Sequence, residues 1–251
     1  MKGVSIVAVS DLHGELGGLA ESARDADILV LAGDIQPAQM GVDSGAWFRG
    51  VFYPMVAEIG CEVVAICGNH DFHLANALNR ADGMKGAPPN FHLLMDSGIE
   101  LMGLKFWGSP WCPWINGRWY FEEDDEDIFD RFNQMPQGID VLLTHTPPRL
   151  QTKKGDAGHQ NDIDVSLECG GCEHFGSASL LDVVKRKSPS VLFCGHIHSG
   201  SHAPAIVTGD TRNTVCYNVS RLDEAYRIAY SPRRIEIRDR SIVEIGGGEH
   251  I

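Results

Sequence analysis

The sequence predicts an α/β fold in which parallel strands alternate with helices and end in polar side chains. Short apolar runs of strand length recur along the chain, and several are separated by stretches with helix-like apolar spacing. Five of these runs are followed directly by acidic, amide or imidazole side chains. The carboxyl edge of an open α/β sheet is where ligands bind, so these side chains are candidates for one site.

The first expected strand, Gly3 to Ser10, ends at Asp11 and His13. These side chains are two positions apart, so in an extended segment they point the same way and can chelate one metal ion. A helix is expected over Glu15 to Arg24. The alternative is an aspartate that caps this helix beside an exposed histidine.

The second expected strand, Asp27 to Ala32, is followed by Gly33 and Asp34. A turn aspartate is the common interpretation of such a motif. Its position in a series of strand-end motifs favours a ligand instead. Apolar residues at helix-like spacing over Ser44 to Ile59 predict the crossover helix to the next strand.

The third expected strand, Val63 to Cys67, runs into Gly68-Asn69-His70-Asp71. The glycine permits a sharp turn, beyond which stand an amide oxygen, an imidazole and a carboxylate. A simple turn is the alternative for this motif alone. A helix is expected over Asp71 to Arg80.

The middle of the chain predicts a β-hairpin over Ile99 to Trp107 that turns near Met102-Gly103. An aromatic stretch follows, from Gly108 to Trp114 and again at Trp119 to Phe121. It is either a small aromatic core under a proline-rich loop or a wall that stacks on an aromatic part of a substrate. The acidic run Glu122 to Asp127 is expected to start a solvated helix.

His145 follows a short apolar strand expected over Asp140 to Thr144, and prolines directly after it fix it on a loop. The long polar segment Gln151 to Phe175 is typical of a lid or binding loop. An amphipathic helix is expected over Ser177 to Lys187. The next strand, Ser190 to Cys194, ends at Gly195-His196-Ile197-His198, whose alternating histidines can face one ion or two adjacent ions.

The tail is expected to complete a second sheet with strands near 204–208, 214–219, 233–238 and 241–245. The chain contains no evident linker, repeat or low-complexity segment. We therefore expect residues 1–251 to form a single domain.

Composition narrows the function. The 251 residues are 43% apolar with a formal net charge of −13, which argues against binding a nucleic-acid polymer. No apolar run is long enough for a bilayer or a signal peptide, so we expect a cytoplasmic protein without a membrane partner. Cys67, Cys194 and Cys216 lie in apolar strands and are expected to be reduced core residues. Cys169 and Cys172 have the spacing of half a zinc site, but a plain loop pair of thiols is favoured.

The strand-end residues together offer more ligands than one metal ion needs. Seven side chains form this set: Asp11, His13, Asp34, Asn69, His145, His196 and His198. With one bridging carboxylate they suit two ions about 3.5–4 Å apart. Mixed imidazole and carboxylate ligands fit Mn, Fe or Zn, with Co, Ni or Mg as alternatives.

In their order along the chain, these motifs resemble the signature of the calcineurin-like metallophosphoesterases. Short stretches such as Gly108-Ser109-Pro110-Trp111 resemble a short, single-domain subgroup, the metallophosphoesterase-domain-containing proteins. The resemblance implies a four-layer α-β-β-α sandwich of two mixed sheets. It also implies that Asp11, His13 and His198 hold one metal, that Asp34 bridges, and that Asn69, His145 and His196 complete the second. By the same resemblance, His70 protonates the leaving group or stabilises the phosphoryl charge, and Asp71 orients His70.

The expected activity is that of a metal-dependent phosphoesterase, most simply a phosphodiesterase on small or nucleotide-like phosphate esters. The family implies in-line attack by a metal-bridging hydroxide. The alternatives are a phosphomonoesterase, a protein phosphatase or a metal-binding scaffold with little turnover. The protein phosphatase is disfavoured because Ile35-Gln36-Pro37 replaces the Val-Asp-Arg-Gly run that follows Gly-Asp in those enzymes.

Overall fold

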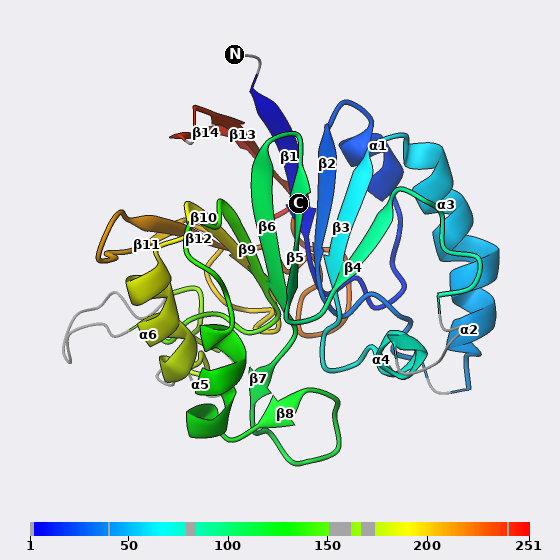
Figure 1. Cartoon of the computed structure of the whole chain (residues 1–251). Coiled ribbons are helices and arrows are strands. Elements are labelled where there is room, and N and C mark those ends of the chain that lie inside the picture. Colours follow the sequence, from blue (N-terminus) through cyan, green and yellow to red (C-terminus); the bar gives the residue numbers. More distant parts are fainter. Residues whose placement is uncertain (1–2, 40, 79–83, 151–161, 167–173, 240) are drawn as a thin grey trace.

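The computed structural model describes residues 3–39, 41–78, 84–150, 162–166, 174–239 and 241–251 (Figure 1). The first of its two six-stranded mixed sheets has the order β14-β13-β1-β2-β3-β4. Its strands are β1 (Val4–Val9), β2 (Ile28–Ala32), β3 (Glu62–Ile66), β4 (Phe91–Leu94), β13 (Arg233–Arg238) and β14 (Ser241–Gly246). β1 to β4 are parallel, so their carboxyl ends lie at one edge.

The second sheet has the order β11-β12-β10-β9-β6-β5. Its strands are β5 (Ser97–Leu101), β6 (Leu104–Ser109), β9 (Val141–Thr144), β10 (Val191–Cys194), β11 (Ala205–Val207) and β12 (Thr214–Asn218). The hairpin of β5 and β6 turns at Met102 and Gly103, both with positive φ, as the sequence predicts. Two short strands, β7 (Cys112–Pro113) and β8 (Glu122–Glu123), form a separate parallel pair.

Helices cover the outer face of each sheet. One group follows the strands of the first sheet: α1 (Leu19–Ala23), α2 (Ser44–Trp47), the π-helical turn η1 (Phe48–Phe52), α3 (Tyr53–Ile59) and α4 (Phe72–Leu78). The second sheet carries α5 (Asp125–Asn133) and α6 (Ala178–Lys187) (Figure 1). α1 begins four residues later than the predicted Glu15 start, after Gly18, whose φ is +71°. Ser177 caps α6 by accepting the Leu180 N–H.

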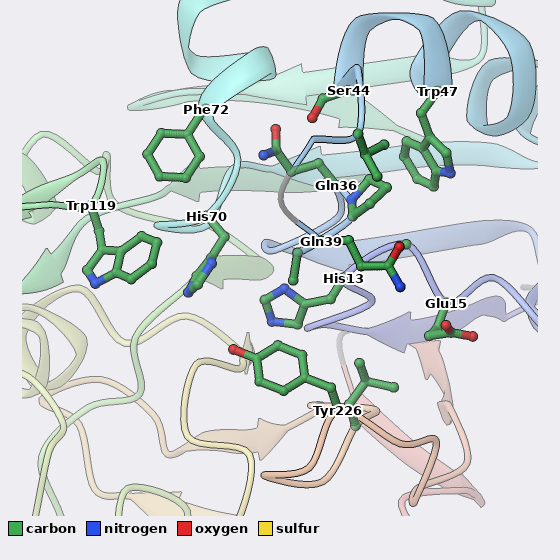
Figure 2. Close-up of a pocket in the computed structure, with 15 residues that line it drawn as sticks. His13, Glu15, Gln36, Gln39, Ser44, Trp47, His70, Phe72, Trp119 and Tyr226 are labelled. Carbon is green, nitrogen blue, oxygen red and sulfur yellow. The ribbon is translucent and has the colours of Figure 1, made fainter.

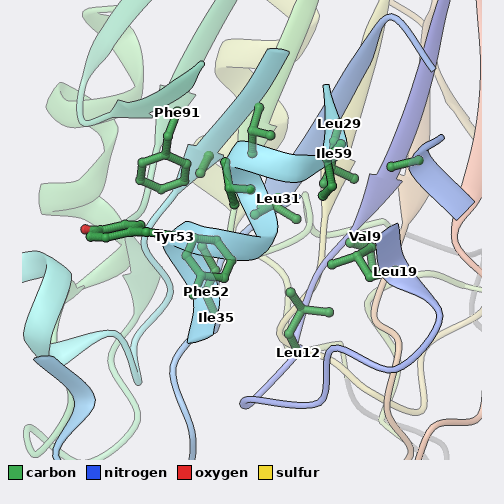
Figure 3. Close-up of a cluster of buried hydrophobic side chains, with 14 of the residues drawn as sticks. Val9, Leu12, Leu19, Leu29, Leu31, Ile35, Phe52, Tyr53, Ile59 and Phe91 are labelled. Atoms are coloured by element: carbon green, nitrogen blue, oxygen red, sulfur yellow. The ribbon is translucent and has the colours of Figure 1, made fainter. Parts of the chain in front are cut away.

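The burial pattern of the strands produces three apolar layers. In β1, Ile6 and Ala8 face the cluster between the sheets, whereas Val7 and Val9 face the cluster under α1 and α3 (Figure 3). A third cluster lies between the second sheet and the helices α5 and α6. Both faces of the central strands of each sheet are therefore buried, which confirms the predicted four-layer α-β-β-α sandwich.

The tail differs from its prediction in one respect. β11 and β12 join the second sheet as expected, but β13 and β14 return to the first sheet, where β13 pairs antiparallel with β1. Ile235 and Ile237 of β13 are buried in the cluster between the sheets. This pairing removes the open edge of β1, so covering that edge explains the return of the chain.

Cysteines at 67, 194 and 216 are buried free thiols, as predicted. Cys169 and Cys172 lie outside the described residues, as does most of the predicted 151–175 loop. Among the helices of the described residues, none has the length and apolarity to cross a membrane.

Candidate metal centre

The seven predicted ligands come together where the carboxyl ends of the two sheets meet. The first sheet supplies Asp11 and His13 after β1, Asp34 after β2 and Asn69 after β3. The second supplies the remaining histidines, His145 after β9, and His196 and His198 after β10. All are buried except His196, which is partly buried.

Glycines allow the strand ends to approach this closely. A Cβ at Gly68 would overlap the Asp34 carboxylate, and one at Gly195 would overlap Ser10 and Asp11. Gly33 has a φ of +100° and lies against the His145 ring and the backbone of Gly68. Glycine is required at these positions because the neighbouring atoms are backbone or ligand atoms with no room to move.

Several ligands also stand on left-handed backbone. Asp11, His13, Asp34 and His196 have φ values of +53°, +43°, +52° and +70°. Non-glycine residues adopt this region seldom and cluster at functional sites when they do. Backbone bonds hold the geometry, because Asp34 accepts the His70 N–H at 2.8 Å and Asp11 accepts the His196 N–H at 3.0 Å.

Asp34 lies between imidazoles of the two sheets. Its Oδ2 atom is 3.5 Å from His13 Nε2 and 3.5 Å from His145 Nε2. Asp11 Oδ1 is 3.4 Å from His198 Nε2 on the other side of the site. Potential ligand atoms of Asp11, His13 and His198 lie within 4.8 Å of one another. The same holds for Asp11, Asp34 and His145, and for His13, Asp34 and His70. The position of Asp34 suits a bridging carboxylate.

Asn69 joins the remaining histidines. Its Oδ1 is 2.9 Å from His145 Nε2 and 3.1 Å from His196 Nδ1. An amide oxygen beside two imidazoles forms a second ligand group, with Asp34 within reach of His145.

The donor set fits bound cations. Both ring nitrogens of His13 are buried without a hydrogen-bond partner among the described residues. Carbonyl oxygens of Ala32 and Asp223 lie 3.0 and 3.1 Å from the Nδ1 atoms of His145 and His198. An Nδ1–H that donates to a carbonyl leaves the Nε2 lone pair for a metal. Ser220 Oγ donates to Asp11 Oδ2 at 2.7 Å and orients that carboxylate.

The pKa values of the buried carboxyl and imidazole groups show how their charges compensate one another in the site. Burial raises the pKa of Asp34, but the charge and hydrogen bond of His145 outweigh it and bring the pKa well below its usual value. Burial lowers the pKa of His145, but the Asp34 charge raises it to about 9. Burial dominates at His13 and His196, whose pKa values fall to about 4 and about 3. The carboxylates of Asp11 and Asp34 are therefore ionised beside positively charged imidazoles. Bound cations would supply the same positive charge.

Asp71 has different contacts from those expected. Its Oδ1 accepts the backbone N–H groups of Ile35 and Gln36, both at 2.9 Å, and its Oδ2 accepts that of Gly68 at 2.8 Å. The described contacts include none between this carboxylate and the His70 ring. Asp71 thus ties the loop after β2 to the loop after β3, and its expected role in orienting His70 stays a prediction without a contact behind it.

A pocket of about 1050 Å³ beside the metal centre is lined by His70 and by the predicted ligand His13 (Figure 2). The ring centroid of His70 is 5.0 Å from that of His13. Trp119 stacks on His70 and lines the pocket, so this part of the predicted aromatic stretch forms a wall. Trp111 instead packs in the interior, where its Nε1 donates to Asp96 at 2.7 Å and Arg131 covers its ring.

Tyr226 also lines the pocket, and no pattern in the sequence predicts it there. It lies 28 residues beyond His198 in an irregular segment, with a φ of +59°. Its ring centroid is 4.7 Å from that of His13 and 5.5 Å from that of His198. Only the fold of the C-terminal segment brings it to the site.

Comparison with known proteins gives relatives over most of the chain. UPF0046 protein C25E10.12 of Caenorhabditis elegans is 29% identical over 248 residues, covering 91% of this chain and 79% of the relative. The human metallophosphoesterase domain-containing protein 1 is 24% identical over 220 residues, or 77% of this chain. The matched region spans 60% of that human protein's length.

A solved crystal structure superimposes over 98% of this chain and 100% of its own, with a TM-score of 0.61 and 16% identity, which supports the fold. The family model described as calcineurin-like phosphoesterase matches residues 4–200. This span contains β1 to β10 and every predicted metal ligand. The chain therefore belongs to the calcineurin-like phosphoesterase family.

Proposed function

We propose that the protein is a dinuclear-metal-dependent phosphodiesterase that acts on small or nucleotide-like phosphate esters. The observation that carries the proposal is the convergence of the predicted nitrogen and oxygen ligands beside an aromatic-walled pocket, which His13 of this set lines. When two cations are bound in such a site, they polarise a phosphoryl group and lower the pKa of water. We expect Mn, Fe or Zn, because imidazole and carboxylate ligands are mixed.

Each side chain has a role in this proposal. Asp11, His13 and His198 hold one cation, Asn69, His145 and His196 hold the other, and Asp34 bridges. His70 lies beside His13 at the edge of the pocket, where its ring can donate a proton to the departing ester oxygen. The organic substituent of the ester occupies the pocket. The net charge of −13 argues against a nucleic-acid polymer as substrate.

The test is a hydrolysis screen of the metal-stripped protein with Mn, Fe, Zn, Co, Ni or Mg added back. It compares bis-p-nitrophenyl phosphate with p-nitrophenyl phosphate. We expect metal-dependent cleavage of the diester and weaker cleavage of the monoester. A preference for the monoester would indicate a phosphatase. Lack of turnover by protein that binds two ions per chain would indicate a metal-binding scaffold.

A further inference from the structure

Gln36 presents a fixed hydrogen-bond donor to the pocket. Its Oε1 atom accepts the backbone N–H of His73 at 2.9 Å, at the start of α4. The carboxamide oxygen accepts hydrogen bonds and the NH₂ group only donates them. The bond from the His73 N–H therefore determines the positions of Oε1 and Nε2. The backbone N–H of Gln36 is also held, by Asp71 Oδ1 at 2.9 Å. The residue is therefore anchored at both ends.

The free end of this carboxamide is its NH₂ group. The described residues provide no acceptor for Nε2, and Gln36 is 6% exposed yet lines the pocket. Figure 2 shows the carboxamide beside the Phe72 ring, on the wall opposite Tyr226. A donor whose orientation is already fixed loses little entropy when an acceptor binds to it.

The rest of the pocket favours a flat group without negative charge. The rings of Trp47, Phe72, Trp119 and Tyr226 line it, and such rings bind planar groups by stacking. None of its fifteen described lining residues is a lysine or arginine, and Glu15 adds a carboxylate. A second anion on the ligand would be desolvated there without a partner, at a cost in affinity.

We propose that the pocket binds one organic substituent of a phosphodiester. This substituent is flat and uncharged and carries a hydrogen-bond acceptor, to which Gln36 donates. This inference rests on the proposed phosphodiesterase function and specifies its substrate class. Gln36 is thus a specificity-determining residue, and the substrate carries a single phosphoryl group and no further anion.

The experiment measures binding of matched phosphonates to the metal-loaded protein by titration calorimetry. The probes are the monomethyl esters of 4-acetylbenzyl, 4-ethylbenzyl and 4-carboxybenzyl phosphonate. In each, the benzyl CH₂ group replaces the bridging oxygen of the corresponding aryl phosphate ester. The acetyl and ethyl groups have similar shapes, but only acetyl carries an acceptor. We expect the wild type to bind the acetyl compound about tenfold more tightly than the ethyl compound. The carboxyl compound should bind more weakly than the acetyl compound.

Variants separate Gln36 from the rest of the pocket. Gln36→Glu keeps an acceptor for the His73 N–H but removes the donor, so it should abolish the acetyl preference without unfolding the start of α4. Gln36→Met should abolish the same preference. Gln39→Met is the matched control, because Gln39 lines the pocket as an exposed side chain without such an anchor, and it should retain the preference.

Equal binding of the acetyl and ethyl probes to the wild type would overturn the inference, as would a preference that survives Gln36→Glu. Failure of every probe to bind protein that cleaves bis-p-nitrophenyl phosphate would overturn it too, while leaving the phosphodiesterase intact. Conversely, an acetyl preference in protein that cleaves no ester with any metal would sustain the pocket's specificity and overturn the proposed function.

Discussion

The imidazole of His70 lies against the indole of Trp119, with ring centroids 4.1 Å apart and planes inclined by 30°. On its other side, the His70 ring meets the edge of His13 at 5.0 Å. The proposed acid is therefore held between a ring that belongs to the pocket wall and a ring that belongs to the metal centre. Aromatic rings thus contact its side chain on two sides, while its backbone N–H donates to Asp34.

Replacing the indole should affect turnover more than metal binding. Trp119→Ala removes an aromatic contact whose strength is about 0.5–1.5 kcal/mol, so kcat/KM for bis-p-nitrophenyl phosphate should fall about two- to thirteenfold. Trp119→Phe retains a ring and should retain most of the activity. Unchanged kcat/KM in Trp119→Ala would mean that the stacking does not position His70.

Removal of the imidazole should have a larger effect. His70→Ala should lower kcat by roughly 10²- to 10⁴-fold, the usual contribution of a positioned general acid. Metal content per chain, measured by plasma mass spectrometry, should stay at the wild-type value, because the seven proposed ligands are other side chains. Equal turnover by the two proteins would remove His70 from the mechanism.

Asp71 should matter for stability through its three backbone hydrogen bonds. Asp71→Asn offers one oxygen in place of two and turns an NH₂ group toward backbone donors, so we expect the free energy of unfolding to fall by about 1–3 kcal/mol. Denaturant titration measures this change. Asp43→Asn is the control, since Asp43 caps α2 by accepting the Ala46 N–H and asparagine caps equally well. A loss as large in the control would argue against a special role for Asp71.

His202 predicts a pH dependence of stability. Burial lowers its pKa to about 4, and its Nε2 bonds the Ser220 carbonyl at 2.7 Å. Below pH 6.5 the unfolded chain binds a proton that the folded chain excludes, so stability is full above pH 6.5 and falls as the pH decreases toward 4. This group contributes up to about 3 kcal/mol to the fall.

His202→Phe keeps a ring to stack on Tyr230, which lies 3.6 Å away, and removes the titration. Unfolding of the metal-free protein should then decline less steeply between pH 6.5 and 4 than in the wild type. The metal-site histidines titrate in both proteins, so their contribution cancels in the difference. Parallel pH profiles would show that His202 has the same pKa in the folded and the unfolded chain.

Glycine at position 68 should be needed for the site more than for the sheet. Gly68→Ala places a Cβ against the Asp34 carboxylate and its backbone nitrogen, so metal affinity should drop by at least tenfold. Gly50→Ala is the control, because a Cβ there meets nothing within 4 Å and alanine favours the helix. Wild-type metal affinity in Gly68→Ala would mean that the loops after β2 and β3 can separate without disturbing the ligands.

Local patterns were sufficient to predict the strands that carry the site. Val63–Cys67 and Val191–Cys194 are short and wholly apolar, and polar residues follow within two positions. Such runs are buried strands in an α/β fold. The predicted ligands came together for the same reason, since parallel strands present their carboxyl ends at one edge. Which of them bind metal stays a prediction, because convergence alone does not identify a ligand.

Long-range pairings could not be inferred in this way. β4 (Phe91–Leu94) was not expected, because only two of its four residues are buried. The strand β13 was predicted in the second sheet but pairs with β1 in the first. Alternation of apolar and polar residues identifies a strand but not its neighbour. The contacts of Asp71 and the approach of Tyr226 depend likewise on loops whose course the sequence does not specify.

The hydrogen bond from Ser220 to Asp11 has a consequence for how the site forms. The two residues are 209 positions apart, and the neighbouring pairing of β13 with β1 joins segments that are still farther apart in the sequence. Bringing such segments together costs loop-closure entropy before any contact repays it, and folds rich in non-local contacts form slowly. During synthesis, Asp11 appears before Ser220 and gains its orienting hydroxyl only after the 208 residues between them have been made. We therefore expect tight cation binding late in folding, so that capture of the ion marks a chain in which these two distant segments have met.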